Sequence, residues 1–277
     1  MKVLRLFSVV ACMFFLGSSV QAQPAKEFKP EVGQQGKDVV WVPTSLALVN
    51  KMLDMAKVTT SDYVIDLGSG DGRTVITAAK RGIKALGIEY NPDMVELSKR
   101  NATKEGVTER ATFMKADLFE TDFSHASVIT MFLLPDINLK LRPKILGLKP
   151  GTRIVSNTFT MGEWEADETG TAASDEGSSY YRTALLWIVP AKVEGTWKMV
   201  NGAAQSDLTF KQEFQKFSGS INAGGVSTLV TGGKMRGDQI SFSAGSAQYA
   251  GTVSGNTITG TVASSGTSRA WSATHTR

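Results

Sequence analysis

The sequence contains a single cysteine, Cys12, and only two histidines, His125 and His275, in 277 residues. A lone cysteine cannot form a disulfide within the chain, and cysteine-based zinc sites are excluded as well, so no metal site is expected. The formal net charge is only +4 and no block of lysines and arginines occurs. A nucleic-acid partner is therefore not expected.

The N-terminal apolar stretch, from Leu6 to Leu16, is shorter than the roughly 20 residues that a membrane-spanning helix needs. Lys2 and Arg5 precede it, and Val20-Gln21-Ala22 follows it as a small-residue cleavage site. This order is typical of a secretory signal peptide, and it predicts cleavage of residues 1–22. We expect the mature protein to be periplasmic or secreted, with no cysteine and no stable membrane anchor.

Two parts of the sequence follow different patterns. Residues 41–192 alternate apolar strand segments with helical segments, which predicts a parallel sheet covered by helices on both faces. Residues 193–277 combine many glycines, serines and threonines with short alternating strands, which predicts a small antiparallel sheet or partial barrel. Residues 23–40 are assigned to a linker. In the first part the expected strands are 64–67, 85–88, 111–114, 127–134 and 153–159, and the expected helices are 46–56, 74–81, 93–104 and 137–146.

The segment Tyr63–Arg73 reads YVIDLGSGDGR, an apolar strand that runs into an acid and three alternating glycines. Glycine lets backbone N–H groups approach a ligand without a side chain in the way. The spacing differs from the phosphate loop G-x-x-x-x-G-K-[ST], and the dinucleotide pattern G-x-G-x-x-G would need glycine in place of Arg73. The pattern suits a ligand with an amino-acid end, whose ammonium group Asp66 can meet.

The run from Asp66 to Gly72 resembles the first motif of class I S-adenosylmethionine-dependent methyltransferases. Two further acids stand where that family places them: Glu89 ends the second strand and Asp117 follows the third. The resemblance implies that Glu89 holds the ribose hydroxyls and that Asp117 contacts the adenine amino group. It also implies a Rossmann-like, seven-strand methyltransferase sheet and the cofactor S-adenosyl-L-methionine. The residues expected to bind this cofactor are Pro43, Thr44, Asp66, Gly68, Ser69, Gly70, Asp71, Gly72, Glu89, Asp117 and Leu118.

Other segments narrow the resemblance, among them Trp41-Val-Pro-Thr44 and Gly87-Ile-Glu-Tyr-Asn-Pro92. They are similar to a small group of methyltransferases that includes mitochondrial protein-lysine methyltransferases and exported bacterial relatives. In that group the segment with Pro43 and Thr44 folds over the cofactor. The resemblance covers roughly residues 40–190 and implies N-methylation of protein lysine, while a small-molecule acceptor remains the alternative.

The acceptor site is expected beyond the fourth strand, near Leu134–Asn138. This segment lacks the [DNS]-P-P-[YFW] pattern of base-amine methyltransferases, and without a cysteine the covalent route to cytosine C5 is excluded. His125 precedes the fourth strand and His275 is third from the C-terminus, so neither stands at the end of that strand and a histidine base is not expected. Asp136 and Asn138 are the predicted catalytic residues, because they are the polar groups best placed to receive a substrate amine. Asp136 can equally cap the following helix.

Two further hypotheses concern the substrate and the activity. An acidic rim around Trp164 would attract a cationic lysine, although such a segment is more often a solvated loop. Export conflicts with a cofactor made in the cytosol, so a non-catalytic exported protein that binds ligands through its C-terminal β domain is the rival interpretation. The complete set of cofactor acids favours an enzyme. The rim residues are Glu163, Glu165, Asp167 and Glu168.

Overall fold

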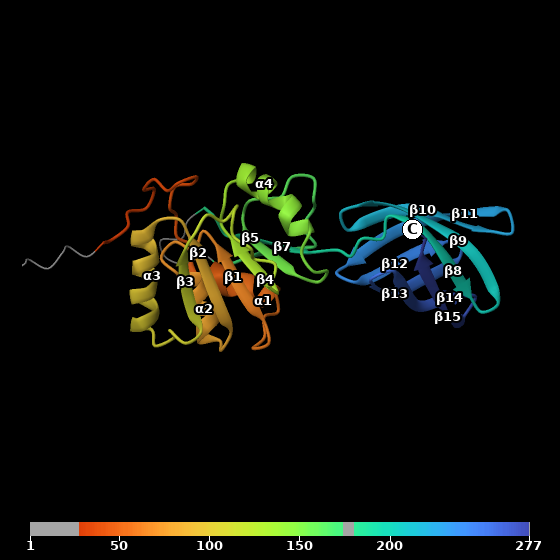
Figure 1. Cartoon of the computed structure of the whole chain (residues 1–277), viewed down its shortest axis with the longest axis horizontal. Coiled ribbons are helices and arrows are strands. Elements are labelled where there is room, and N and C mark those ends of the chain that lie inside the picture. The colour runs from red at the N-terminus through yellow and green to blue at the C-terminus, as the bar shows by residue number, and fades with distance from the viewer. Residues whose placement is uncertain (1–27, 174–179, 277) are drawn as a thin grey trace, which may run out of the picture.

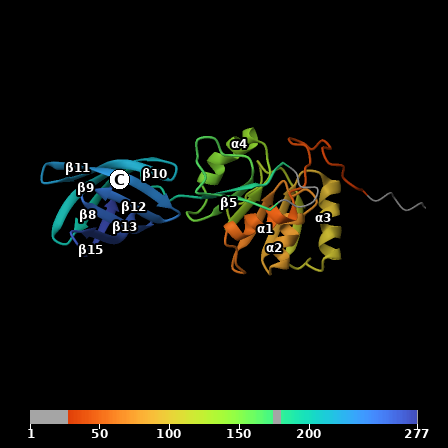
Figure 2. The ribbon, with the colours of Figure 1, turned by 180° about the vertical axis from the view of Figure 1, so that it is seen from behind.

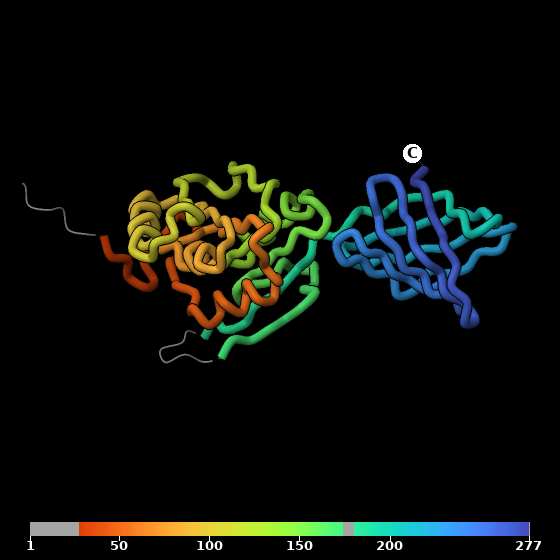
Figure 3. Tube along the Cα trace, turned by 90° about the horizontal axis from the view of Figure 1, so that it is seen from below, coloured from red at the N-terminus to blue at the C-terminus, as the bar shows by residue number. Residues whose placement is uncertain are grey.

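The structure, a computed structural model, describes residues 28–173 and 180–276, so the predicted signal peptide lies outside the described residues. An α/β domain and an all-β domain lie end to end along the long axis of the molecule (Figure 1), and a second direction shows the same arrangement (Figure 3). This confirms the predicted fold class. In the described part of the chain, no helix has the length and apolar character needed to cross a membrane.

A seven-stranded sheet forms the centre of the first domain, in the order β3-β2-β1-β4-β5-β7-β6. The strands β1 to β5 all run parallel to one another, whereas β7 runs antiparallel to both β5 and β6. The order reverses between β1 and β4, and in such sheets a crevice forms there at the carboxyl ends of the strands. The strands are β1 (Tyr63–Leu67), β2 (Lys84–Glu89), β3 (Ala111–Lys115), β4 (Val128–Met131), β5 (Arg153–Asn157), β6 (Glu168–Thr171) and β7 (Thr183–Ile188).

Helices cover both faces of this sheet. Helices α1, α2 and α3 lie on one face, which Figure 2 shows, and α4 lies on the other. Because successive strand residues point to opposite faces, Val64 belongs to the apolar core under α1 and α2, and Ile65 to the core under α4. The helices are α1 (Leu46–Met55), α2 (Arg73–Lys80), α3 (Pro92–Lys104) and α4 (Pro135–Leu146).

Local sequence explains where most of these elements begin and end. The Ser45 hydroxyl accepts from the Leu48 N–H at the start of α1, and the Asn91 side chain accepts from the Asp93 N–H at the start of α3. Helix α4 begins at Pro135 with no side-chain cap, so Asp136 is not its cap. Strand β4 ends at residue 131, three residues earlier than predicted, and residues 132–134 leave the sheet.

The second domain is a closed, antiparallel, eight-stranded barrel in the order β10-β11-β12-β13-β14-β15-β8-β9. Its interior is filled by side chains, among them the buried rings of Trp197, Phe210, Phe242 and Trp271, as expected for eight strands. The predicted partial barrel is therefore closed. Its strands are β8 (Gly195–Asn201), β9 (Ala204–Glu213), β10 (Lys216–Ala223), β11 (Val226–Arg236), β12 (Gln239–Ala244), β13 (Ala247–Ser254), β14 (Thr257–Ser264) and β15 (Thr267–His275).

Contacts between the two domains come from the segment that follows β5 and from the stretch between β7 and β8. Trp164 is fully buried, and its ring stacks on that of Phe214 with centroids 6.0 Å apart. The Gln215 amide donates to the Glu165 carbonyl at 2.7 Å, and the Ala191 N–H donates to the carbonyl of residue 237 at 2.8 Å. Apolar packing and hydrogen bonds therefore both tie the barrel to the sheet.

The same contacts show that the hypothesis of an acidic rim is wrong. Its aromatic residue is buried, and three of its acids are neutralised by neighbouring cations. The pairs are Glu163 with Arg142, Glu165 with Lys216 and Glu168 with Arg236. The fourth acid, Asp167, accepts from the Ile188 N–H at 2.9 Å.

Candidate active site

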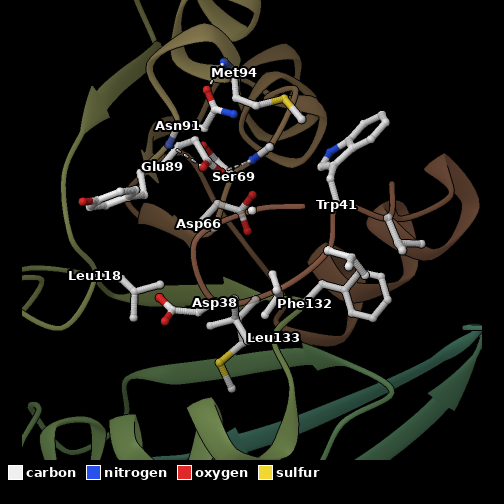
Figure 4. A pocket seen from close by; sticks show the side chains of 18 of the residues that line it. Asp38, Trp41, Asp66, Ser69, Glu89, Asn91, Met94, Leu118, Phe132 and Leu133 are labelled. Atoms are coloured by element: carbon white, nitrogen blue, oxygen red, sulfur yellow. Dashed lines mark hydrogen bonds between the residues drawn. The ribbon is translucent and has the colours of Figure 1, made fainter. Parts of the chain in front are cut away.

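A pocket lies at the carboxyl ends of the parallel strands, where the strand order reverses (Figure 4). Its walls are the glycine loop, by which we mean residues 66–72, the residues after β2, β3 and β4, and a segment that we call the strap, residues 34–44. Ten of the eleven predicted cofactor residues line it. They are Pro43, Thr44, Asp66, Gly68, Ser69, Gly70, Asp71, Glu89, Asp117 and Leu118.

Asp66 is the buried acid of the pocket. It is 6% exposed, and its Oδ1 accepts a hydrogen bond from the Thr130 hydroxyl at 2.6 Å. Burial raises the pKa of Asp66 to about 7, and the charges of Glu89 and Asp71 add to this effect. No cation pairs with Asp66 in the described residues, so the site suits a ligand that brings its own ammonium group.

Glu89 lies on the other side of Asp66 from Phe132 and Leu133 (Figure 4). Its Oε2 accepts from the Gly70 N–H and its Oε1 from the Asn91 N–H, each at 2.9 Å. A carboxylate oxygen has two acceptor positions, so each oxygen can still accept one hydroxyl. This geometry fits the two neighbouring hydroxyls of a ribose.

The glycine loop owes its residue types to close contacts. A side chain at position 70, where φ is +52°, would bring its Cβ within 2.6 Å of Trp41 Nε1, and one at Gly87 would come within 2.5 Å of the Ser69 hydroxyl. The eleventh predicted residue, Gly72, immediately precedes α2 and lies against Phe113, outside the pocket lining of the described chain.

Asp71 acts on the strap through Arg73. Its carboxylate accepts from Arg73 Nε and Nη2 at 3.0 and 2.6 Å, and Arg73 Nη1 donates to the Thr44 carbonyl at 2.9 Å. A planar guanidinium can make such a bidentate contact and a third bond at once. The loop and the strap are thereby held together at the mouth of the pocket.

At the adenine end the strap reaches Asp117. Lys37 Nζ donates to Asp117 Oδ2 at 2.5 Å and lies 4.6 Å from the centre of the Tyr90 ring. The hydrogen bond from Lys37 lowers the pKa of the Asp117 carboxyl. Residues 34–40, which sequence analysis assigned to a linker, thus belong to the wall of the site.

The two predicted catalytic residues do not meet in the pocket. Asn138 is completely buried, and its Nδ2 donates to the carbonyl oxygens of Phe159 and Thr160 at 3.3 and 3.1 Å. Its amide therefore holds the loop after β5. Asp136 is exposed in the first turn of α4, and the described pocket lining does not include it. Its catalytic role stays a prediction that this placement does not support.

Three aromatic residues of the pocket were not predicted from the sequence: Phe132, Phe159 and Tyr181. The first two follow β4 and β5, and the third precedes the antiparallel β7, so all three lie at the same edge of the sheet. Their position next to strand ends could have indicated them, because ligands of such sheets bind at the carboxyl ends of the strands.

Both histidines lie away from the pocket. His125 contacts the ring of Tyr63 at the opposite edge of the sheet, and His275 packs on Trp197 in the barrel. Within residues 28–173 and 180–276, no group of three histidine, cysteine or acidic side chains could hold a metal ion.

These residues fit S-adenosylmethionine along its whole length. Asp66 can hold the ammonium of its methionine end, the glycine loop leaves room for its middle, Glu89 can accept from its ribose hydroxyls, and Asp117 lies at the adenine end. The fold and the site define a class I S-adenosylmethionine-dependent methyltransferase.

Comparison with known proteins places the chain within this class. The family described as the ANTKMT methyltransferase domain matches residues 66–168. A protein-lysine N-methyltransferase of Saccharolobus islandicus is 47% identical over 154 residues, which is 54% of this chain and 94% of that protein. The chain therefore belongs to the family of this protein-lysine N-methyltransferase.

Two further similarities are to a relative matched over less than half of its length and to a solved structure described as an RNA methyltransferase. The adenine nucleotide translocase lysine N-methyltransferase of Mus musculus is 33% identical over 104 residues, which is 37% of this chain and 45% of that relative. A solved structure, described as an RNA methyltransferase from Salinibacter ruber with S-adenosyl-L-homocysteine, is 43% identical with a TM-score of 0.50. It covers 55% of this chain and 96% of its own, and its bound product supports the cofactor assignment.

Proposed function

We propose that this protein transfers a methyl group from S-adenosylmethionine to the side-chain amine of lysine in a protein substrate. The observation that carries the proposal is the division of the pocket. Its described carboxylates all lie in the strap or at the ends of β1, β2 and β3, whereas the part over β4, β5 and β7 is apolar and aromatic. The identity with the Saccharolobus protein supports lysine as the acceptor.

The chain's own residues prepare both partners of this reaction. When bound, S-adenosylmethionine supplies an electrophilic methyl group: the C–N bond to the acceptor forms as the C–S bond breaks, and the amine loses a proton to water. Asp66 would hold the methionine end of the methyl donor, and Glu89 would hold its ribose. The acceptor part of the pocket has no carboxylate that would pair with the ammonium and hold the amine in its unreactive protonated form.

We also propose that the protein works outside the cytosol, because basic residues, an apolar stretch and a small-residue cleavage site follow one another at its N-terminus. Fractionation of expressing cells should recover the mature protein in the periplasm or medium, with Gln23 as its first residue. Recovery of the full chain in the cytosol alone would contradict the proposed location.

The transfer itself is tested with tritium-labelled methyl donor and separate protein, RNA and lipid fractions of a cell extract. We expect label in protein, with methyl-lysine released by acid hydrolysis. Asp66→Asn should abolish this labelling, whereas Asp122→Asn, the same change at an exposed acid outside the pocket lining, should not. Label confined to RNA, lipid or small molecules would refute lysine as the acceptor.

A further inference from the structure

Three aromatic rings form one wall of the pocket, and the proposed function by itself assigns them no role. The ring of Phe132 lies 5.9 Å from that of Phe159 and 5.1 Å from that of Tyr181, and the last two are 5.8 Å apart, all between centroids. Each side chain is half-buried and lines the pocket. We call these three residues the aromatic wall.

The wall lies at the acceptor end of the pocket. The sheet order places β4, β5 and β7, which carry it, on the opposite side of β1 from β2 and β3, which carry Glu89 and Asp117. The ligand's ribose and adenine are therefore held on one side of Asp66. A methyl acceptor must approach from the other side, where Figure 4 shows Phe132 and Leu133.

The backbone that carries Phe159 is held in an unfavourable conformation. Thr158 has φ +61°, a region that β-branched residues rarely adopt. Two bonds fix the ring's own residue: the Phe159 N–H donates to the Asn157 carbonyl at 2.7 Å, and its carbonyl accepts from Asn138. Strain of this kind persists where the surrounding structure determines it, and it is frequent at ligand sites.

The same turn is connected to the strap. The Asn157 side chain donates to the Thr44 hydroxyl at 3.2 Å, and the Thr158 hydroxyl donates to Asn157 Oδ1 at 2.9 Å. The segment over the methyl donor and the turn that presents Phe159 therefore share one hydrogen-bonded network.

Ring geometry decides how a cation can use this wall. Rings whose centroids are 5.1–5.9 Å apart touch one another and leave no space between them for an ammonium group. A cation against the exposed side of the cluster, however, comes within the range of about 6 Å at which aromatic faces attract it. This attraction depends on charge and size, and it does not require N–H donors.

We infer that Phe132, Phe159 and Tyr181 form the acceptor subsite, which binds the aliphatic chain and ammonium group of lysine and also of lysine that already carries methyl groups. The inference rests on the proposed function, and it adds that successive methylation is permitted. A site built on carboxylate or carbonyl acceptors would lose a hydrogen bond with each added methyl group, whereas the aromatic wall would not.

The experiment compares the affinities of two probes for the protein in the presence of S-adenosylhomocysteine. Each affinity is measured by an NMR titration. One probe is an acetylated, amidated trimethyl-lysine, and the other is its neutral isostere with carbon in place of the side-chain nitrogen. We expect the cation to bind about threefold to thirtyfold more tightly than the isostere. Equal binding of the two probes would overturn the inference.

Variants locate the effect. Phe159→Leu keeps apolar volume but removes a ring, and it should remove most of the preference for the cation. Phe132→Leu should do the same and serves as the second variant if the first fails to fold, which S-adenosylhomocysteine binding checks. Tyr181→Phe keeps its ring and should keep the preference. Tyr63→Leu changes a half-buried ring at the opposite edge of the sheet and should also keep it.

The outcomes separate the inference from the proposed function. Protein methyl-lysine formed by a protein with no preference for the cation leaves the function standing and overturns the inference. A preference that Phe159→Leu removes, in a protein that methylates no lysine, supports the subsite and refutes the function. A monomethyl-lysine peptide should be methylated with a kcat/KM within about threefold of that of the unmodified peptide. If the enzyme methylates the unmodified peptide but not the monomethyl-lysine peptide, the inference is overturned.

Discussion

Asp66 is the residue on which the account of the cofactor site depends most. Its carboxylate is buried, accepts from Thr130 and has a pKa raised to about 7 by burial. No cation of the described chain pairs with it, and the ammonium of a bound ligand would supply that positive charge. The raised pKa makes this residue sensitive to pH in two measurable ways.

The first prediction concerns cofactor affinity. The ammonium group binds the ionised form of Asp66, so affinity should rise with pH up to about 7 and level off above it, where the carboxylate is already ionised. Below that point the Kd should increase by up to about tenfold per pH unit. Calorimetric titrations between pH 5 and 7.5 measure this, and an affinity independent of pH in that range would contradict the role of Asp66.

The second prediction concerns the protein without ligand. Because the folded-state pKa of Asp66 lies above the unfolded value, the folded state binds more protons between about pH 4 and 7, and ionisation destabilises it as the pH rises through that window. Asp66→Asn, which removes the charge, should therefore raise the Tm at pH 8 by a few °C. The corresponding gain in the free energy of unfolding is on the order of 1–2 kcal/mol.

The same substitution supplies its own control. At pH 5 the wild-type carboxyl is protonated in the folded state, so the Tm values of wild type and Asp66→Asn should nearly coincide. An equal difference at pH 5 and pH 8 would show that the buried charge is not its cause.

At the residue scale, sequence could predict the acids but not every partner. Asp66 and Glu89 stand at the ends of adjacent strands, and two short local segments place them: the motif that begins at Asp66 and the apolar strand that ends at Glu89. Asn138 was misjudged because its polar side chain follows β4 in sequence. Its position inside the α4 packing, where it holds the loop after β5, depends on the tertiary structure.

At the scale of elements, the strap differs most from its prediction, because residues predicted to form a linker line the pocket. Its residues lack strand or helix periodicity, so sequence analysis assigned those before Trp41 to a linker. A bridge between Gln35 and Val40 lies within the strap itself. Two charged contacts attach the strap to the rest of the molecule, the Thr44 carbonyl with Arg73 and Lys37 with Asp117. These partners come from far along the chain, and local patterns do not predict them.

The third prediction tests this strap. Lysine cannot reproduce the bidentate contact with Asp71 together with the bond to Thr44, so Arg73→Lys should loosen the strap and weaken cofactor affinity about tenfold. Amide hydrogen exchange over residues 34–44 should become faster.

Arg81→Lys is the matched control, because Arg81 contacts Asp54 and Asn50 away from the pocket. Its cofactor affinity and the exchange of the strap should stay as in wild type. Unchanged affinity in Arg73→Lys as well would mean that the strap does not contribute to binding.

The aromatic wall is a second feature that depends on the topology of the sheet and that local sequence patterns do not predict. Phe132, Phe159 and Tyr181 belong to three separate segments, and they meet only because β4, β5 and β7 are neighbours in the sheet. The parallel strands could be predicted from apolar runs, but the position of the antiparallel β7 beside β5 could not. The acceptor end of the pocket was consequently the least predictable part of the site.

At the scale of the whole molecule, the barrel is a packed neighbour of the methyltransferase domain. The ring of Phe214 contacts both Trp164 and the guanidinium of Arg142, which is 5.3 Å from the ring centre. Composition predicted the change from α/β to all-β structure, since glycine turns and short strands replace helical periodicity. The acids after β5 were interpreted as a substrate rim because the cations of β10 and β11 that neutralise two of them are distant in sequence.

The fourth prediction tests this coupling. Phe214 has φ +52°, which asparagine tolerates, so Phe214→Asn removes the ring without adding backbone strain. Loss of the stacking should cost about 1–3 kcal/mol and divide a single calorimetric transition into two. Cofactor affinity should not change, because the described interface residues do not line the pocket.

Tyr180→Asn, the same kind of change at a fully exposed ring, should leave one transition. Two transitions already present in the wild-type protein would contradict the coupling of the domains.

The central claim is that this fold and pocket bind S-adenosylmethionine as a working methyltransferase does. Isothermal titration of the mature protein with the cofactor at pH 7.5 tests it most directly, with Asp66→Asn titrated in parallel. The account predicts one site per chain, a Kd in the range of about 1 μM to 1 mM, and binding at least tenfold weaker in Asp66→Asn. No heat of binding at millimolar cofactor, or equal binding by the variant, would contradict it.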